Sequence, residues 1–252
     1  MKIRSVILLA LLAFVVTIVV RFPADVVFAN INTNPLVISN PAGTIWSGTA
    51  RSAGVVNGPA RAEAVEWTLN PLTLISGKLG ALIDFKILDG TGEANVARAF
   101  NGDVFVSDAD LSINAQSLVA LMPAALVQLG GKLNLRLDDA HFNPQHPESI
   151  RGQLLWSNAQ IRDPVTASLG QVTLDINPHS AGHTAELKNQ GGVINISGKV
   201  DIDKQGGYRA DIRLQPVPNA PPDIDSTLSL LGRKGSDGSY RLRQNGRLRD
   251  LL

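Results

Sequence analysis

The chain has 252 residues, of which 44% are apolar, a formal net charge of +1 and no cysteine. This balance of charge excludes a global field that selects an anionic polymer, and an aromatic content of 5% argues against stacking platforms for nucleic acid. The lack of cysteine excludes disulfides, thiolate metal sites and cysteine nucleophiles.

The sequence begins with a short basic segment, which an apolar run follows. Lys2 and Arg4 precede an uncharged run from Ser5 to Val20, and Arg21 follows it. A helix over this run is about 24 Å long, and the stems of the flanking arginines extend its apolar length. The pattern predicts a single-pass transmembrane helix.

The excess of positive charge before this run predicts that the N-terminus stays in the cytoplasm and the rest is exported. The alternative is a signal peptide cleaved after Val27-Phe28-Ala29, and both interpretations export residues 30–252. The predicted boundaries for the anchored form are residues 1–4 in the cytoplasm, 5–21 as the transmembrane anchor and 22–252 as a periplasmic β domain.

Alternation of apolar and polar residues dominates the exported part. It is clear at 65–69, 133–137, 172–176 and 208–214, where every second residue is apolar. Such a period of two gives each strand one buried and one solvent-exposed face, and it is typical of antiparallel pairing. We therefore predict a mainly β fold of antiparallel sheets.

One exported segment has helical spacing. Leu118, Leu121, Leu126 and Leu129 recur at intervals that place them on one side of a helix. Pro123 is expected to split this helix. The prediction is a short helical insert at residues 115–129 that covers the end of a sheet.

A short β-prone stretch, Gly43 to Ala50, contains one of only three tryptophans. Alternation puts Trp46 and Gly48 on the same face, where the missing side chain of the glycine allows a ring to approach closely. The stretch is echoed at Gly152 to Ala159, which contains Trp156. Both tryptophans are expected in the core, so that Trp46→Ala would cost about 3–5 kcal/mol if the side chain is buried.

Three landmarks recur in the same order along the chain. Besides the tryptophan stretches, 67–71 matches 174–178 through Asn-Pro, and 76–79 matches 197–200 through Ser-Gly-Lys. This order predicts two similar β halves, at about 35–114 and about 130–252; the alternative is a compositional bias of a turn-rich β protein. The residues predicted to be structural are Trp46, Gly48, Trp67, Pro71 and Trp156.

Motifs for catalysis or cofactor binding do not emerge from the sequence. The four histidines lie in turn-like segments, and no Gly-x-Ser-x-Gly or complete dinucleotide-binding pattern occurs. We therefore predict no enzyme activity, no catalytic residue, no metal ligand and no cofactor.

The C-terminus carries the one marked asymmetry of charge. From residue 233 onward, the sequence contains six basic residues and only two acidic ones. Such a surface can dock an acidic partner or anionic lipid head groups, or it can protect a terminal edge strand from unwanted pairing. The predicted contact residues are Arg233, Lys234, Arg241, Arg243, Arg247 and Arg249.

The N-terminal apolar run, the Gly43–Gly48 stretch and Trp67-Thr68-Leu69-Asn70-Pro71 together resemble the general secretion pathway protein N family. The resemblance extends from the N-terminus to about Leu214. It implies an accessory inner-membrane component of the type II secretion system of Gram-negative bacteria. Its implied partners are the inner-membrane platform and the secretin, with no nucleic acid and no small-molecule substrate.

A function of another class remains open. Two amphipathic β halves also suit an AsmA-like periplasmic protein, in which a curled sheet forms an apolar trough that shields lipid tails.

Overall fold

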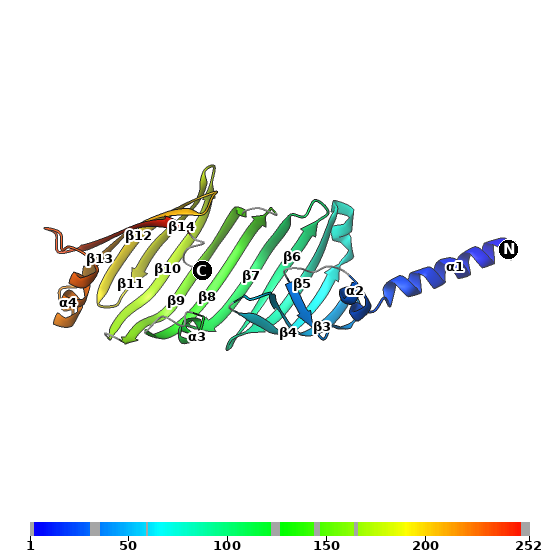
Figure 1. Cartoon of the computed structure of the whole chain (residues 1–252), viewed down its shortest axis with the longest axis horizontal. Coiled ribbons are helices and arrows are strands. Elements are labelled where there is room, and N and C mark those ends of the chain that lie inside the picture. Colours follow the sequence, from blue (N-terminus) through cyan, green and yellow to red (C-terminus); the bar gives the residue numbers. More distant parts are fainter. Residues whose placement is uncertain are drawn as a thin grey trace.

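The computed structural model describes residues 3–30, 36–58, 60–121, 127–143, 147–163 and 166–247. Figure 1 shows one long antiparallel sheet, with a helix projecting from its N-terminal end. The sheet has 14 strands in the order β1-β3-β4 and then in sequence to β14, while β2 pairs with β3 beside β1. The fold is therefore a meander in which chain neighbours are also sheet neighbours, as the sequence predicted for a mainly β, antiparallel protein.

The strands differ in length, and the longest lie in the middle of the sheet. The strands are β1 (Leu36–Ser39), β2 (Ala42–Gly43), β3 (Ser47–Val55), β4 (Arg61–Asn70), β5 (Lys78–Ile87), β6 (Gly90–Ala99), β7 (Val104–Asn114), β8 (Gln128–Phe142), β9 (Pro147–Asp163), β10 (Ala167–His179), β11 (Gly182–Gln190), β12 (Ile194–Asp203), β13 (Gly207–Pro216) and β14 (Tyr240–Arg247). The helices are α1 (Ile3–Val20), α2 (Ala24–Asn30), the 3₁₀ helix η1 (Pro71–Ser76), α3 (Ala115–Val119) and α4 (Pro222–Leu231).

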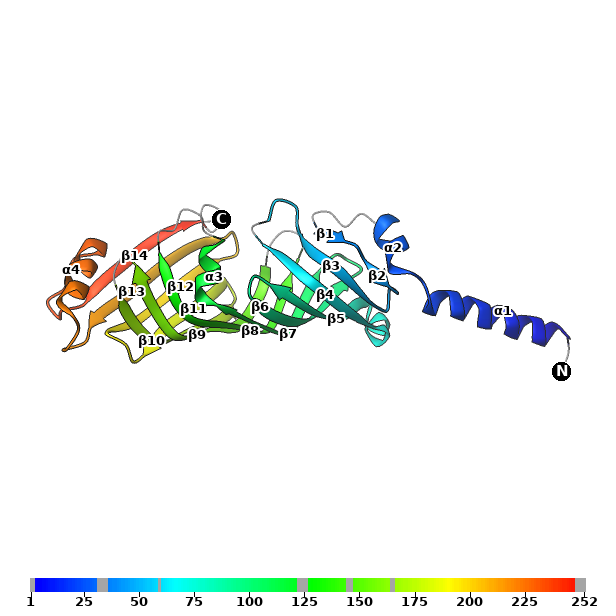
Figure 2. The same cartoon turned by 90° about the horizontal axis from the view of Figure 1, so that it is seen from below.

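The sheet curls into an open trough, which Figure 2 shows from below. Irregular pairings interrupt the register between β4 and β5, β6 and β7, and β8 and β9. Ala64, Asp108 and Asn158 adopt left-handed backbone angles, with φ near 50°. Because an extra residue bends a strand and increases its twist, these bulges account for the curvature of the sheet.

Two hydrophobic clusters line the inner face of the trough. At the C-terminal end, Ile224 and Leu228 of α4 pack with Tyr240 of β14. In the middle, Ala115 of α3 packs with Leu133 of β8. Trp156 contacts both clusters and so joins them along the trough floor.

The prediction of two similar halves is wrong, because one continuous sheet runs through both. The matched landmarks have different structures. Gly77 ends η1 with φ of 72°, whereas Gly198 lies within β12. Pro71 is the first residue of η1, whereas Pro178 lies within β10, one residue before the strand ends. Glycine and Asn-Pro fit several kinds of turn and strand, so their repetition did not indicate a repeated fold.

The prediction of a transmembrane helix is also wrong. The apolar run does form a helix, α1, which has 18 residues and a length of about 27 Å. Within the described part of the chain, no helix combines the length and the apolar character needed to cross a membrane.

The helix found near the predicted insert is shorter than expected. It is α3, which ends at Val119, while β8 already includes Leu129, Gly130 and Gly131. Pairing of this segment with β9 overrides its helical spacing. Residues 122–126, which contain Pro123, lie outside the described residues.

Candidate functional site

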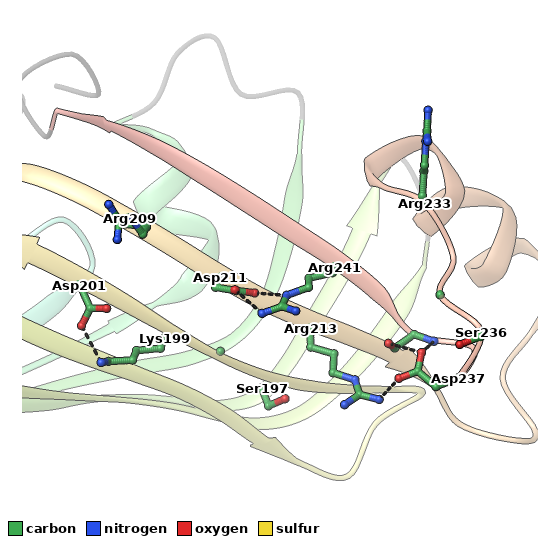
Figure 3. A pocket seen from close by; sticks show the side chains of 13 residues that line it. Ser197, Lys199, Asp201, Arg209, Asp211, Arg213, Arg233, Ser236, Asp237 and Arg241 are labelled. Atoms are coloured by element: carbon green, nitrogen blue, oxygen red, sulfur yellow. Dashed lines mark hydrogen bonds and ion pairs between the residues drawn. The ribbon is translucent and has the colours of Figure 1, made fainter.

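The last three strands present a charged outer face. Side chains alternate along β14, so Tyr240 and Leu242 point toward the trough while Arg241 and Arg243 point outward. We call the surface over β12 to β14 the C-terminal basic surface (Figure 3). It comprises Lys199, Asp201, Arg209, Asp211, Arg213, Arg233, Asp237, Arg241 and Arg243.

A carboxylate holds two of its arginines in place. Arg241 donates from Nε and Nη2 to the two oxygens of Asp211, at 2.6 and 2.5 Å, and Arg243 Nε donates to the same carboxylate at 3.3 Å. These hydrogen bonds, above all that from Arg241, lower the pKa of Asp211. Arg213 pairs with Asp237 in the same surface. The arginines are therefore ordered by carboxylates rather than loosely solvated.

A shallow hollow of about 740 Å³ lies on this surface. Its lining contains five basic side chains and three carboxylates, an excess of two positive charges. Within the described residues, Arg209 and Arg233 have no carboxylate partner, and Figure 3 shows them apart from the paired groups. These two cations remain available to an anionic group of a partner.

The other predicted contact residues are placed differently. Lys234 pairs with Asp225 of α4 at 2.6 Å, and its Nζ lies 5.7 Å from the centre of the Tyr240 ring. It therefore joins α4 to β14. Arg247 is exposed at the end of β14, and Arg249 lies outside the described residues. Arg209, in contrast, belongs to the surface but was missed, because only folding brings β13 beside β14.

The outer edge of β14 is open. β14 pairs with β13 on one side, and along its length no other described strand pairs with its second side. Only Tyr240 forms an isolated bridge there, to Lys234. Beyond this bridge, every second residue of 241–247 directs its backbone N–H and C=O away from β13, where an added strand can pair with them.

A second candidate site lies at the opposite end of the trough, and we call it the N-terminal apolar hollow. It measures about 450 Å³, and every residue that lines it is apolar. It lies over β1, β3, β4 and β5, beside α2. The lining residues are Val27, Phe28, Leu36, Ile38, Ile45, Ala50, Ala53, Ala62, Val65, Trp67, Leu69, Leu79, Ala81, Ile83 and Phe85.

The predicted structural residues cluster around this hollow, with one exception. Trp67 lines it, stacks edge-on against Phe28 and donates to the carbonyl of Ile45. A Cβ on Gly48 would lie 2.4 Å from Cζ2 of Trp67. The exception is Trp156, whose Nε1 donates to the carbonyl of Gly130 at 2.8 Å in the middle of the sheet.

Trp46 and Pro71 lie in the connections at the same end of the sheet. Trp46 lies in the turn before β3, where it is half-buried. Pro71 is the first residue of η1, and the side chain of Asn70 caps that helix by accepting from the backbone nitrogen of Leu72.

The histidines do not form a metal site in the part of the chain that the structure describes, where no three potential ligands gather. His141 pairs with Asp103 at 3.1 Å and stacks on Phe105. His183 is buried, and burial is the main cause that lowers its pKa. His146 lies outside the described residues.

The sequence matches the family model described as type II secretion system (T2SS), protein N, over residues 34–243. This range includes every strand from β1 to β13 and the first half of β14. The chain belongs to this family. The family resemblance found in the sequence is thereby confirmed. It makes the chain a component of type II secretion. Proteins of this family are accessory secretion components and are not known enzymes.

Curated members of the type II secretion system protein N family are similar along most of their length. The protein of Aeromonas hydrophila is 26% identical over 247 residues, covering 95% of this chain and 96% of the relative. That of Vibrio cholerae is 24% identical over 241 residues, covering 92% of this chain and 93% of the relative. That of Pectobacterium carotovorum is 24% identical over 219 residues, with 84% of each chain covered. No solved structure matches the chain.

Proposed function

We propose that this protein is an accessory, inner-membrane-associated component of the type II secretion machinery, with its β domain in the periplasm. In this role it helps folded proteins to cross the outer membrane by contacting platform proteins, the secretin, or both. The family match over residues 34–243 carries this proposal, since it extends over nearly the whole sheet.

The contacts are made through the C-terminal basic surface and the adjacent free edge of β14. An open edge offers backbone hydrogen bonds, and the flanking arginines select an acidic partner. The unpaired cations Arg209 and Arg233 add this selectivity without being needed for folding, because neither is tied to a carboxylate of the described chain. Arg233, Arg241, Arg243 and Arg247 thus act as contact residues, whereas Lys234 acts mainly on α4.

Charge reversal tests this role. In a deletion strain that carries the gene on a plasmid, the double variant Arg209→Glu/Arg233→Glu should lower the amount of a secreted enzyme in the medium by about tenfold, with the enzyme retained in the periplasm. The matched control is Arg51→Glu/Arg98→Glu, which reverses two exposed arginines far from β14. Unimpaired secretion by the deletion strain itself would contradict the proposal.

A second candidate function is the binding of lipid. The N-terminal apolar hollow favours it, because an open and entirely apolar hollow has no evident use in a contact made by charges and strand edges. Lipid binding is compatible with a role in secretion, and the two functions are tested by separate measurements.

A further inference from the structure

The apolar inner face of the trough is covered by the chain itself at two places. At the C-terminal end, α4 inserts Ile224 and Leu228, which are 2% and 4% exposed. In the middle, α3 places Ala115 and Leu118 against β7 and β8. At the N-terminal end, the helix beside the sheet is α2, and it contributes only Val27 and Phe28 to the lining. Among the described residues, this end of the trough therefore lacks the cover that the other two have.

Small side chains create the space. Ala50, Ala53, Ala62 and Ala81 all line the hollow, on three neighbouring strands. Larger residues at these positions would fill the hollow as Ile224 and Leu228 do at the other end. An open and entirely apolar hollow of about 450 Å³ is typical of a site that binds an apolar ligand.

The chemistry and the size of the lining argue against a peptide backbone inside the hollow. An extended peptide carries backbone donors and acceptors along its length, and all of the lining side chains are apolar. A helix satisfies its own backbone, but one turn of about 10 Å diameter and 5.4 Å pitch already occupies about 420 Å³. A hydrocarbon chain has no polar backbone groups to satisfy and is thinner than a helix. If a methylene group takes about the space of a water molecule, about 30 Å³, the hollow holds about fifteen of them.

The lining also decides which part of a lipid enters. It contains no cation or hydroxyl that would replace the hydration of a carboxylate, so a head group must remain outside. The hollow lies beside α2, and α1 ends just before α2, with the carbonyl of Val19 bound by Trp46. α1 exposes more than half of Leu11, Leu12 and Phe14, and it extends this apolar surface away from the sheet, beginning at the end that lies beside α2 (Figure 1).

We propose that the N-terminal apolar hollow binds one acyl chain of a membrane phospholipid, whose head group stays outside the trough. This inference rests on the lipid-binding candidate above and names its ligand. It is independent of the contacts of β14 with other secretion proteins, so either can fail without the other.

Photo-crosslinking of the full chain tests it. The purified protein is reconstituted into vesicles of phosphatidylethanolamine and phosphatidylglycerol that contain a phosphatidylethanolamine with a diazirine on one acyl chain. Trypsin then separates the relevant regions. Peptides 62–78 and 79–86 carry lining residues of β4 and β5, and peptide 5–21 carries most of α1.

We expect labelling of peptides 62–78 and 79–86. Filling the hollow with Ala81→Phe, or independently with Ala53→Phe, should lower the labelling of peptide 62–78 by about tenfold. The control Ala181→Phe, in the exposed turn after β10, should leave it unchanged. Circular dichroism establishes that each variant is folded, and secretion of an enzyme by the same variants is scored separately.

Label confined to peptide 5–21, or label on 62–78 that persists in both folded filled variants, would overturn the proposal. A free fatty acid with the same diazirine forms the second arm of the experiment. If the fatty acid labels 62–78 while the phospholipid does not, the ligand is a free fatty acid and the proposal is wrong.

Discussion

The indole nitrogen of Trp46 donates a hydrogen bond of 2.7 Å to the carbonyl of Val19, a residue 27 positions earlier. Val19 lies in the last turn of α1, where helix carbonyls lack partners within the helix. Two further backbone contacts follow, from Ile45 to Phe22 and between Pro23 and Thr44. The Gly43–Ala50 stretch is therefore the joint between the N-terminal helices and the sheet.

Trp46→Phe should loosen this joint while leaving the sheet intact. The change removes one hydrogen bond, worth about 1 kcal/mol, and keeps most of the ring contacts. Hydrogen–deuterium exchange should rise in residues 18–22 and not in β8 or β9. Because Trp46 is half-buried, Trp46→Ala should cost less than the about 3–5 kcal/mol expected for a buried tryptophan. Uniformly faster exchange throughout the sheet would refute a local role.

Gly48→Ala should destabilise the N-terminal end of the sheet. A Cβ at this position would lie 2.4 Å from both the carbonyl oxygen of Ala42 and Cζ2 of Trp67. Such overpacking costs about 1–3 kcal/mol. The measurement is urea unfolding followed by tryptophan fluorescence. The control is Gly58→Ala, whose Cβ would have its nearest contact at 3.1 Å and should change the unfolding free energy far less.

The sequence predicted the class of fold well because strand alternation is a local signal. Val65, Trp67 and Leu69 were placed on one face, and all three line the same hollow. The curl of the sheet was not predictable, since the bulge at Ala64 depends on pairing with β5 and has no glycine or asparagine to mark it. Without the curl, neither the trough nor its open end can be inferred.

Helix α4 was missed for a different reason. Four prolines between 216 and 222 are typical of an extended connector, yet Pro222 stands at the first turn of the helix and Asp223 and Asp225 follow it. At the C-terminal basic surface, the sequence predicted the arginines of β14 but not Arg209 or Asp211. These become neighbours only through the β13–β14 register, in which Asp211 lies opposite Arg243.

Leu228→Ala should destabilise the C-terminal end of the trough by about 2–5 kcal/mol, because it leaves a cavity where α4 meets Tyr240. Leu230, two residues away on the same helix, is 86% exposed. Leu230→Ala should therefore have an effect within about 0.5 kcal/mol. The comparison of the two variants by urea unfolding isolates the role of α4 as a cover. Equal effects would show that α4 does not pack as described.

Acidification should weaken the fold through His183. Burial lowers its pKa below the ordinary histidine value of 6.5, and among described groups its Nε2 has no hydrogen-bond partner. The unfolded chain therefore binds a proton at a higher pH than the folded chain does. Stability is retained above pH 6.5 and falls as the pH drops below it.

The groups that act electrostatically on His183 are His179 and Lys204, and both oppose its protonation. The urea midpoint of the wild type should fall between pH 7.5 and about pH 5.5, and the fall should be smaller in His183→Leu. His179→Leu, a change at an exposed histidine, serves as the control and should keep most of the pH dependence. An unchanged slope in His183→Leu would assign the pH dependence to other groups.

Site-specific crosslinking in living cells tests the central claim most directly, namely that the open edge of β14 contacts other type II secretion proteins. A photoreactive amino acid replaces Asn245, which is exposed on the arginine side of β14, or Arg51, which is exposed on β3 at the far end of the sheet. The account predicts a crosslink from position 245 to a platform protein or the secretin, and none of comparable yield from position 51. The absence of a crosslink from 245, or equal crosslinks from both positions, would contradict it.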